Sequence, residues 1–203
     1  MRRITTWLMT AGLLAAPLAH AALEVGMVAP ASGSAAPLGI GMQQGVQAYF
    51  AQLNSEGGID GETLSLTTFD DQYSPLLAAK HTRDLVGNDN LLAAIGNVGT
   101  PTAAVTIPIY NQEKTLLFGA FTGAGILRRS PPDRYVINYR ASYVQETATM
   151  IEGLLAAGIE PEEIAFFTQN DSFGDAGYNG AIRALNAQGF SNTSQLVHGR
   201  FTR

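Results

Sequence analysis

The stretch LLAAIGNVGTPT, residues 91–102, decides how this chain is read. Five apolar residues, a turn with glycine at Gly96 and Gly99, and the segment AAVTIPIY at residues 103–110 predict a strand, a tight turn and a helix. In a parallel sheet such a turn lies at the carboxyl end of its strand, which is where ligands bind. The function of the chain therefore depends on what this turn holds.

The same strand–turn–helix pattern repeats on both sides of this stretch. Strands are predicted at residues 23–29, 63–69, 91–97, 115–120, 134–139, 163–169 and 194–201. Helical spacing of apolar residues is clearest at Met42, Val46 and Phe50, and a glycine pair at residues 57–58 ends that helix. Repeated βα units predict an α/β fold of doubly wound parallel sheets, with helices on both faces.

The first 21 residues have the features of a secretory signal peptide. Arg2 and Arg3 precede an apolar run at residues 7–18, and Ala19-His20-Ala21 fits the small-residue cleavage pattern. The run is shorter than the roughly 20 residues that a membrane span needs. We therefore expect a cleaved, periplasmic protein that is not embedded in a membrane.

Net charge limits the classes of partner that the chain can bind, and cysteine content limits how its fold is stabilised. The formal charge is -5, and removal of two arginines with the signal peptide makes it -7, which disfavours nucleic acid as a partner. The sequence has no cysteine, so the fold has no disulfide framework and depends on its apolar core.

The turn at residues 96–102 predicts binding of a small anion. It lacks the Lys-Ser/Thr pair of a phosphate loop, and its glycine spacing does not match a dinucleotide fingerprint. A helix N-terminus with the hydroxyls of Thr100 and Thr102 favours a carboxylate, with Thr102 acting as a helix cap. The turn GAFTGAG, residues 119–125, adds Thr122. Because neither turn carries a titratable base, we expect binding without catalysis, and neither a cofactor nor a metal.

Six segments together resemble the type I periplasmic binding proteins of the branched-chain amino acid class. They are PASGSAAPLG (residues 30–39), NSEGGIDG (54–61), FDDQYSPLLAAK (69–80), GNVGTPT (96–102), GAFTGAG (119–125) and NDSFGDAGYNGAI (170–182). The resemblance runs from about residue 23 to the end of the chain. It implies two α/β lobes that close on an amino acid or amide and deliver it to an ABC permease.

The resemblance also implies boundaries and contacts. Residues 22–139 would form the first lobe, and residues 140–203 the start of a second, truncated lobe. The acid that holds the ligand's ammonium in this family is expected beyond residue 203. The implied ligand contacts are Leu38, Gly99, Thr100, Ala120, Thr122 and Phe173.

Other polar residues are interpreted more simply. Asp70 and Asp71 are expected to cap the following turn rather than bind a metal. Tyr143 and Glu146 are interpreted as an exposed helix start, and residues 128–129 as a solvated pair of arginines. A sensory binding domain of the same fold, an exported enzyme and a non-functional gene fragment stay open, although no G-x-S-x-G elbow or cysteine nucleophile supports an enzyme.

Overall fold

The computed structural model describes residues 22–202, so the predicted signal peptide lies outside the described residues. Five parallel strands form the first sheet in the order β2-β1-β3-β4-β5. They are β1 (Leu23–Ala29), β2 (Leu64–Asp70), β3 (Leu91–Ile95), β4 (Leu117–Phe118) and β5 (Val136–Ile137). This order reverses direction between β1 and β3, as in doubly wound folds.

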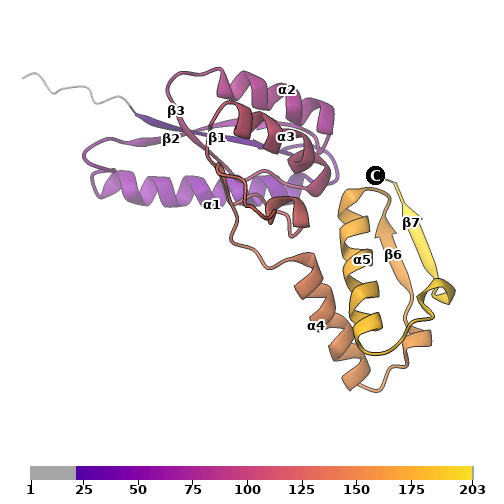
Figure 1. The fold of residues 1–203 in the computed structure, drawn as a ribbon. Helices are drawn as coiled ribbons and strands as arrows, with labels where there is room; N and C mark the ends of the chain where they lie inside the picture. The colour runs from indigo at the N-terminus through magenta and orange to yellow at the C-terminus, as the bar shows by residue number, and fades with distance from the viewer. Residues whose placement is uncertain (1–21, 203) are drawn as a thin grey trace, which may run out of the picture.

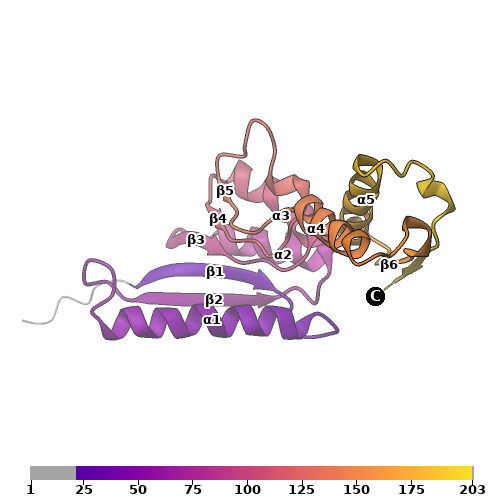
Figure 2. The ribbon, with the colours of Figure 1, turned by 90° about the horizontal axis from the view of Figure 1, so that it is seen from below.

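Helices cover both faces of this sheet (Figures 1 and 2). Helix α1 (Ala36–Ser55) lies on one face, and α2 (Pro75–Val86) and α3 (Thr100–Gln112) lie on the other. The alternation of β1 explains this arrangement: Met27 packs with Met42 of α1, whereas Val28 packs with Leu85 of α2 and Ile107 of α3. The prediction of an α/β, doubly wound fold is confirmed.

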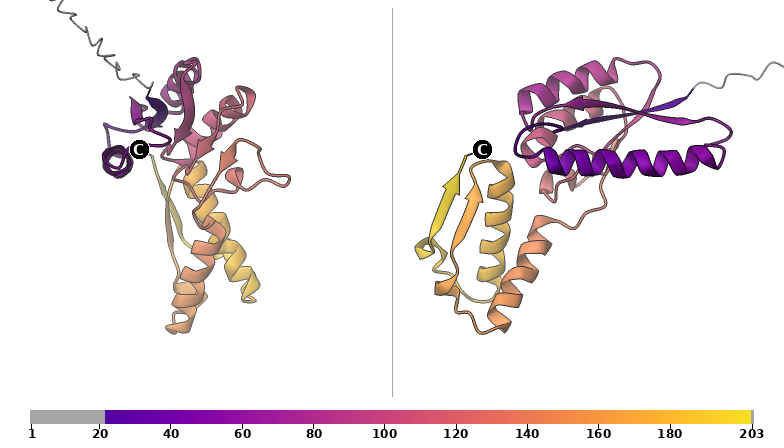
Figure 3. Two further views of the ribbon diagram at one scale, coloured as in Figure 1. Left: turned by 90° about the vertical axis from the view of Figure 1, so that its left-hand side faces the viewer. Right: turned by 180° about the vertical axis from the view of Figure 1, so that it is seen from behind.

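A second, smaller parallel sheet follows along the chain. It consists of β6 (Phe166–Gln169) and β7 (His198–Phe201). Helices α4 (Tyr143–Ala156) and α5 (Ser172–Ala187) pack against each other, and Ile151 and Leu185 lie in their shared core. Figure 3 shows α5 lying along β6. The predicted lobe boundary, between residues 139 and 140, falls in the segment that joins β5 to α4; it stays a prediction.

Five strands, β3 to β7, are shorter than the sequence pattern predicts, and β4 and β5 are the shortest. The segments 115–120 and 134–139 contribute only two residues each to β4 and β5. At one end of β4, the Thr115 N–H donates to the Tyr110 carbonyl of α3; at the other, Gly119 has a φ of 70°. Both features end the extended conformation, so the chain turns soon after Phe118.

Candidate functional site

A cleft of about 390 Å³ lies between the first sheet and the α4–α5 pair. From the first sheet's side it is lined by Leu38, Tyr73, Val98, Gly99 and Phe121. From the other side it is lined by Arg140, Tyr143, Glu146, Thr147, Met150, Gln169, Phe173 and Gly177. Its floor is the carboxyl edge of a parallel sheet, where ligands are expected.

Glycine shapes the floor of the cleft at Gly99. This residue is the N-cap of α3 with a φ of 109°, and a Cβ there would overlap the ring of Tyr73. Glycine alone adopts this conformation without strain and leaves room for the ring. In the part of the chain that the structure describes, no side chain caps the N-terminus of α3. The assignment of Thr102 as the cap was wrong, because its hydroxyl donates to the carbonyls of Val98 and Gly99.

The two predicted turns are joined beneath the cleft. The Phe121 N–H donates to the Asn97 carbonyl at 2.7 Å, and the hydroxyls of Thr100 and Thr122 are 2.7 Å apart. Thr122 also accepts the Ala124 N–H. Since both threonines are buried, their hydroxyls form an internal layer under the turn.

The structure places the six predicted ligand contacts in two groups. Leu38, Gly99 and Phe173 line the cleft, with Phe173 packed edge-on against Tyr143 at a ring distance of 5.4 Å. Thr100, Ala120 and Thr122 are buried and are not among the lining residues. Their role as ligand contacts stays a prediction.

The wall formed by α4 was missed from the sequence. Tyr143 is buried and Glu146 lines the cleft, so the interpretation of both as an exposed helix start was wrong. Tyr143, Glu146, Thr147 and Met150 follow each other at helical spacing on one face of α4. This stripe of polar and aromatic residues lies beside the apolar stripe that faces the core. Its helical spacing was the feature of the sequence that could have indicated a second covered face of α4.

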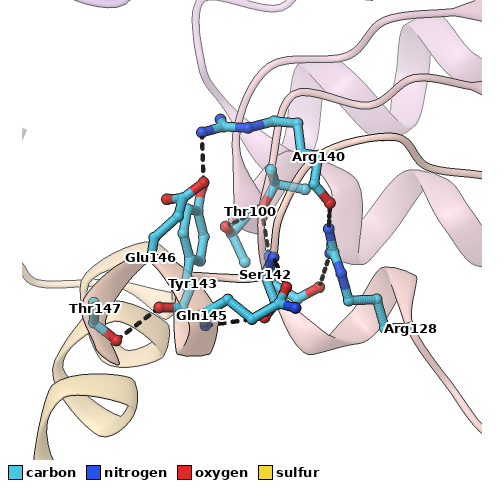
Figure 4. A network of polar contacts seen from close by, with 10 residues as sticks. Thr100, Arg128, Arg140, Ser142, Tyr143, Gln145, Glu146 and Thr147 are labelled. Carbon is cyan, nitrogen blue, oxygen red and sulfur yellow. Dashed lines mark hydrogen bonds and ion pairs between the residues drawn. The ribbon is translucent and has the colours of Figure 1, made fainter. Parts of the chain in front are cut away.

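Charged groups meet where the chain crosses to α4 (Figure 4). Arg140 Nη2 is 3.0 Å from Glu146 Oε1, and the Arg140 guanidinium lies 4.4 Å from the centroid of the Phe121 ring. Arg128 donates to the carbonyls of Ala124 and Arg140. Burial lowers the pKa of the Arg128 guanidinium, and the Glu146 carboxylate opposes this shift. Arg128 is therefore tied to the backbone at the crossing rather than fully solvated.

Comparison with known proteins identifies the class. A family model described as periplasmic binding protein matches residues 22–199, and the chain belongs to this family. A possible leucine/isoleucine/valine-binding protein from Rhodopirellula baltica has a similar solved structure, with a TM-score of 0.87 and 46% identity, covering 93% of this chain and 50% of that one. A substrate-binding periplasmic protein from Ralstonia solanacearum gives a TM-score of 0.80 and 30% identity, covering 89% and 50%.

A curated relative gives the same result within a shorter segment. The Leu/Ile/Val-binding protein BraC3 of Rhizobium johnstonii is 35% identical over 101 residues, which cover 50% of this chain and 26% of that protein. The predicted resemblance to the branched-chain amino acid class of periplasmic binding proteins is confirmed. The chain spans about half the length of the two solved structures. Within residues 22–202, no helix has the length and apolar character needed to cross a membrane.

Proposed function

We propose that this chain is a periplasmic receptor that binds an amino acid, or a related small carboxylate or amide, and delivers it to an ABC permease. The observation that carries the proposal is the cleft between the carboxyl edge of the first sheet and the α4–α5 wall. Its volume of about 390 Å³ is in the range of small-molecule sites. In this proposal residues 1–21 act as the cleaved export signal.

The ligand carboxylate lies at the N-terminus of α3 in this proposal. The absence of a side-chain cap there supports it, because the free N–H groups and the helix dipole favour an anion. Thr100, Ala120 and Thr122 are the proposed partners of the carboxylate, which then replaces the hydrogen bond that the two hydroxyls now share. Leu38 and Phe173 cover the ligand from opposite walls. None of these groups needs to act as a base, so the ligand is bound and released unchanged.

Closure of the two walls takes place at the crossing near residues 138–141. The Asn138 amide donates to the Leu127 carbonyl, and Arg128 holds the Arg140 carbonyl. These hydrogen bonds fix the chain on the first-sheet side and favour rotation of α4 and α5 as one body.

Thermal unfolding of the full chain with a panel of amino acids, amides and simple carboxylates tests the proposal. A ligand present at 100 times its Kd stabilises a receptor by about 2.7 kcal/mol. We expect one class of solutes to raise the transition temperature. A cooperative transition that no solute in the panel moves would contradict the proposal.

A further inference from the structure

An ion pair lies in the wall of a largely apolar cleft. Arg140 and Glu146 both line the cleft, and their side chains are 23% and 28% exposed. The neighbouring lining residues, among them Phe121, Tyr143 and Met150, are apolar or aromatic. Placing a charged pair on such a wall costs desolvation.

The Arg140–Glu146 pair is held in place, but not all of its hydrogen-bond donors and acceptors are used. The guanidinium of Arg140 lies over Phe121, and Arg128 holds the backbone of Arg140. A guanidinium has five N–H groups and a carboxylate has two oxygens. Among residues 22–202, Arg140 donates from its side chain only to Glu146 Oε1, and Glu146 Oε2 accepts no hydrogen bond. Arg128, the other nearby cation, donates to carbonyls and is not among the lining residues. The wall therefore offers spare donors beside a spare acceptor.

Such a wall discriminates between ligands by the arrangement of their charges. A ligand with only a carboxylate is attracted by Arg140 and repelled by Glu146. A ligand with only an ammonium is attracted by Glu146 and repelled by Arg140. A ligand whose anion and cation are neighbours can lie antiparallel to the pair and satisfy both. These interactions are stronger in a partly desolvated cleft than in bulk water.

We propose that the Arg140–Glu146 pair is the charge filter of the cleft: Arg140 attracts the same carboxylate that the N-terminus of α3 binds, and Glu146 faces the ligand's ammonium. The filter deepens the proposed function and rests on it. It admits zwitterions and rejects acids or amines of the same shape. The ammonium partner then comes from α4, within residues 22–202, whereas the family resemblance led us to expect it beyond residue 203.

Two sets of matched ligands test the filter on the full chain. One set is leucine, isocaproate (leucine without its amino group) and isoamylamine (leucine without its carboxylate). The other is phenylalanine, hydrocinnamate and phenethylamine. By calorimetric titration we expect an amino acid to bind about tenfold tighter, or more, than its acid or its amine.

Variants separate the filter from a structural role. Glu146→Gln keeps the side-chain shape, and we expect it to bind acid and amino acid with similar affinity. Arg140→Met should lose the preference of the cleft for ligands that carry a carboxylate. Arg129→Met is the matched control, because Arg129 is 56% exposed and pairs with Asp133 outside the cleft. It should bind like the unchanged chain. Melting temperatures without ligand report whether each variant is folded.

The binding results distinguish a failure of the charge filter from a failure of the proposed receptor function. If the unchanged chain binds isocaproate as tightly as leucine and hydrocinnamate as tightly as phenylalanine, the filter is wrong while the receptor function stands. If Glu146→Gln weakens all ligands by the same factor, the pair is a structural tie and the filter is again wrong. If no solute of either panel binds, the proposed function fails together with the filter.

Discussion

The hydroxyl pair of Thr100 and Thr122 joins two turns that are far apart in sequence. Their oxygens are 2.7 Å apart, and both residues are buried. Thr122→Val keeps the shape of the side chain, leaves the Thr100 hydroxyl and the Ala124 N–H without their partner, and should lower the free energy of unfolding by about 1–2 kcal/mol. Urea denaturation measures this change. Thr149→Val, at an exposed position of α4, is the control and should change it by less than about 0.5 kcal/mol.

Asp71 makes the stability of the chain depend on pH. Burial raises its pKa from 3.8 to about 6; the hydrogen bond from the Tyr73 N–H opposes the shift, and the charge of Asp70 adds to it. The folded chain keeps a proton that the unfolded chain releases between these values, so the contribution of Asp71 to the free energy of unfolding falls as pH rises from about 4 to about 6. Asp71→Asn should remove this slope, which denaturation at several pH values measures.

The neighbouring Asp70 provides a comparison of opposite sign. Its burial opposes ionisation, but hydrogen bonds from the Ser32 hydroxyl and from backbone N–H groups leave its pKa lowered. Its contribution to stability is therefore lost as pH falls, and Asp70→Asn should remove a slope of the other sign. Equal slopes in the two variants would contradict the assignment.

The packing of α5 on β6 depends on glycine at position 174, which has no side chain. A Cβ at Gly174 would overlap the carbonyl oxygen of Gln169, whereas a Cβ at Gly177, one turn further along α5, meets no atom within 4 Å. Gly174→Ala should therefore lower the free energy of unfolding by about 1–3 kcal/mol. Gly177→Ala should leave it unchanged or raise it by up to about 1 kcal/mol, because alanine favours helix. Equal effects in denaturation experiments would contradict this account of the contact.

Elements defined by local signals were predicted well from the sequence. Helix α1 ends at Ser55, just before the glycine pair at residues 57–58 that was predicted to end it. The bounds of β1 also match the predicted strand. Strand β4 was predicted too long, because its ends are set by a contact with α3 and by the turn at Gly119, which the apolar pattern does not record.

At the scale of the whole molecule, export should leave a chain without tryptophan. Trp7 is the sole tryptophan of the sequence and lies in the predicted signal peptide. After export, this chain should therefore lack tryptophan emission and be lighter by the mass of residues 1–21. Ala21→Glu places a large charged residue at the cleavage position and should block processing. Periplasmic protein that retains Trp7 would contradict the predicted cleavage.

The cleft was only half predictable because its walls come from distant parts of the chain. Leu38, Gly99 and Phe173 lie beside recognisable turns, and all three line the cleft. Arg140 and Glu146 are brought there by the path of the chain between the two sheets; helical spacing marks the face of α4 that carries Glu146 but not what that face lies against. Polar residues at a helix start look the same in sequence whether they face solvent or a ligand.

Within residues 22–202, the five strands of the first sheet come from one continuous stretch, Leu23 to Ile137. As a chain leaves a ribosome or a translocation channel, its N-terminal part is free to fold first. The first sheet and its three helices are therefore able to assemble while α4 and α5 are still emerging. The cleft needs both walls, so we expect it to form only after α4 and α5 have folded, and a nascent chain stalled before α4 would fold the first-sheet wall alone.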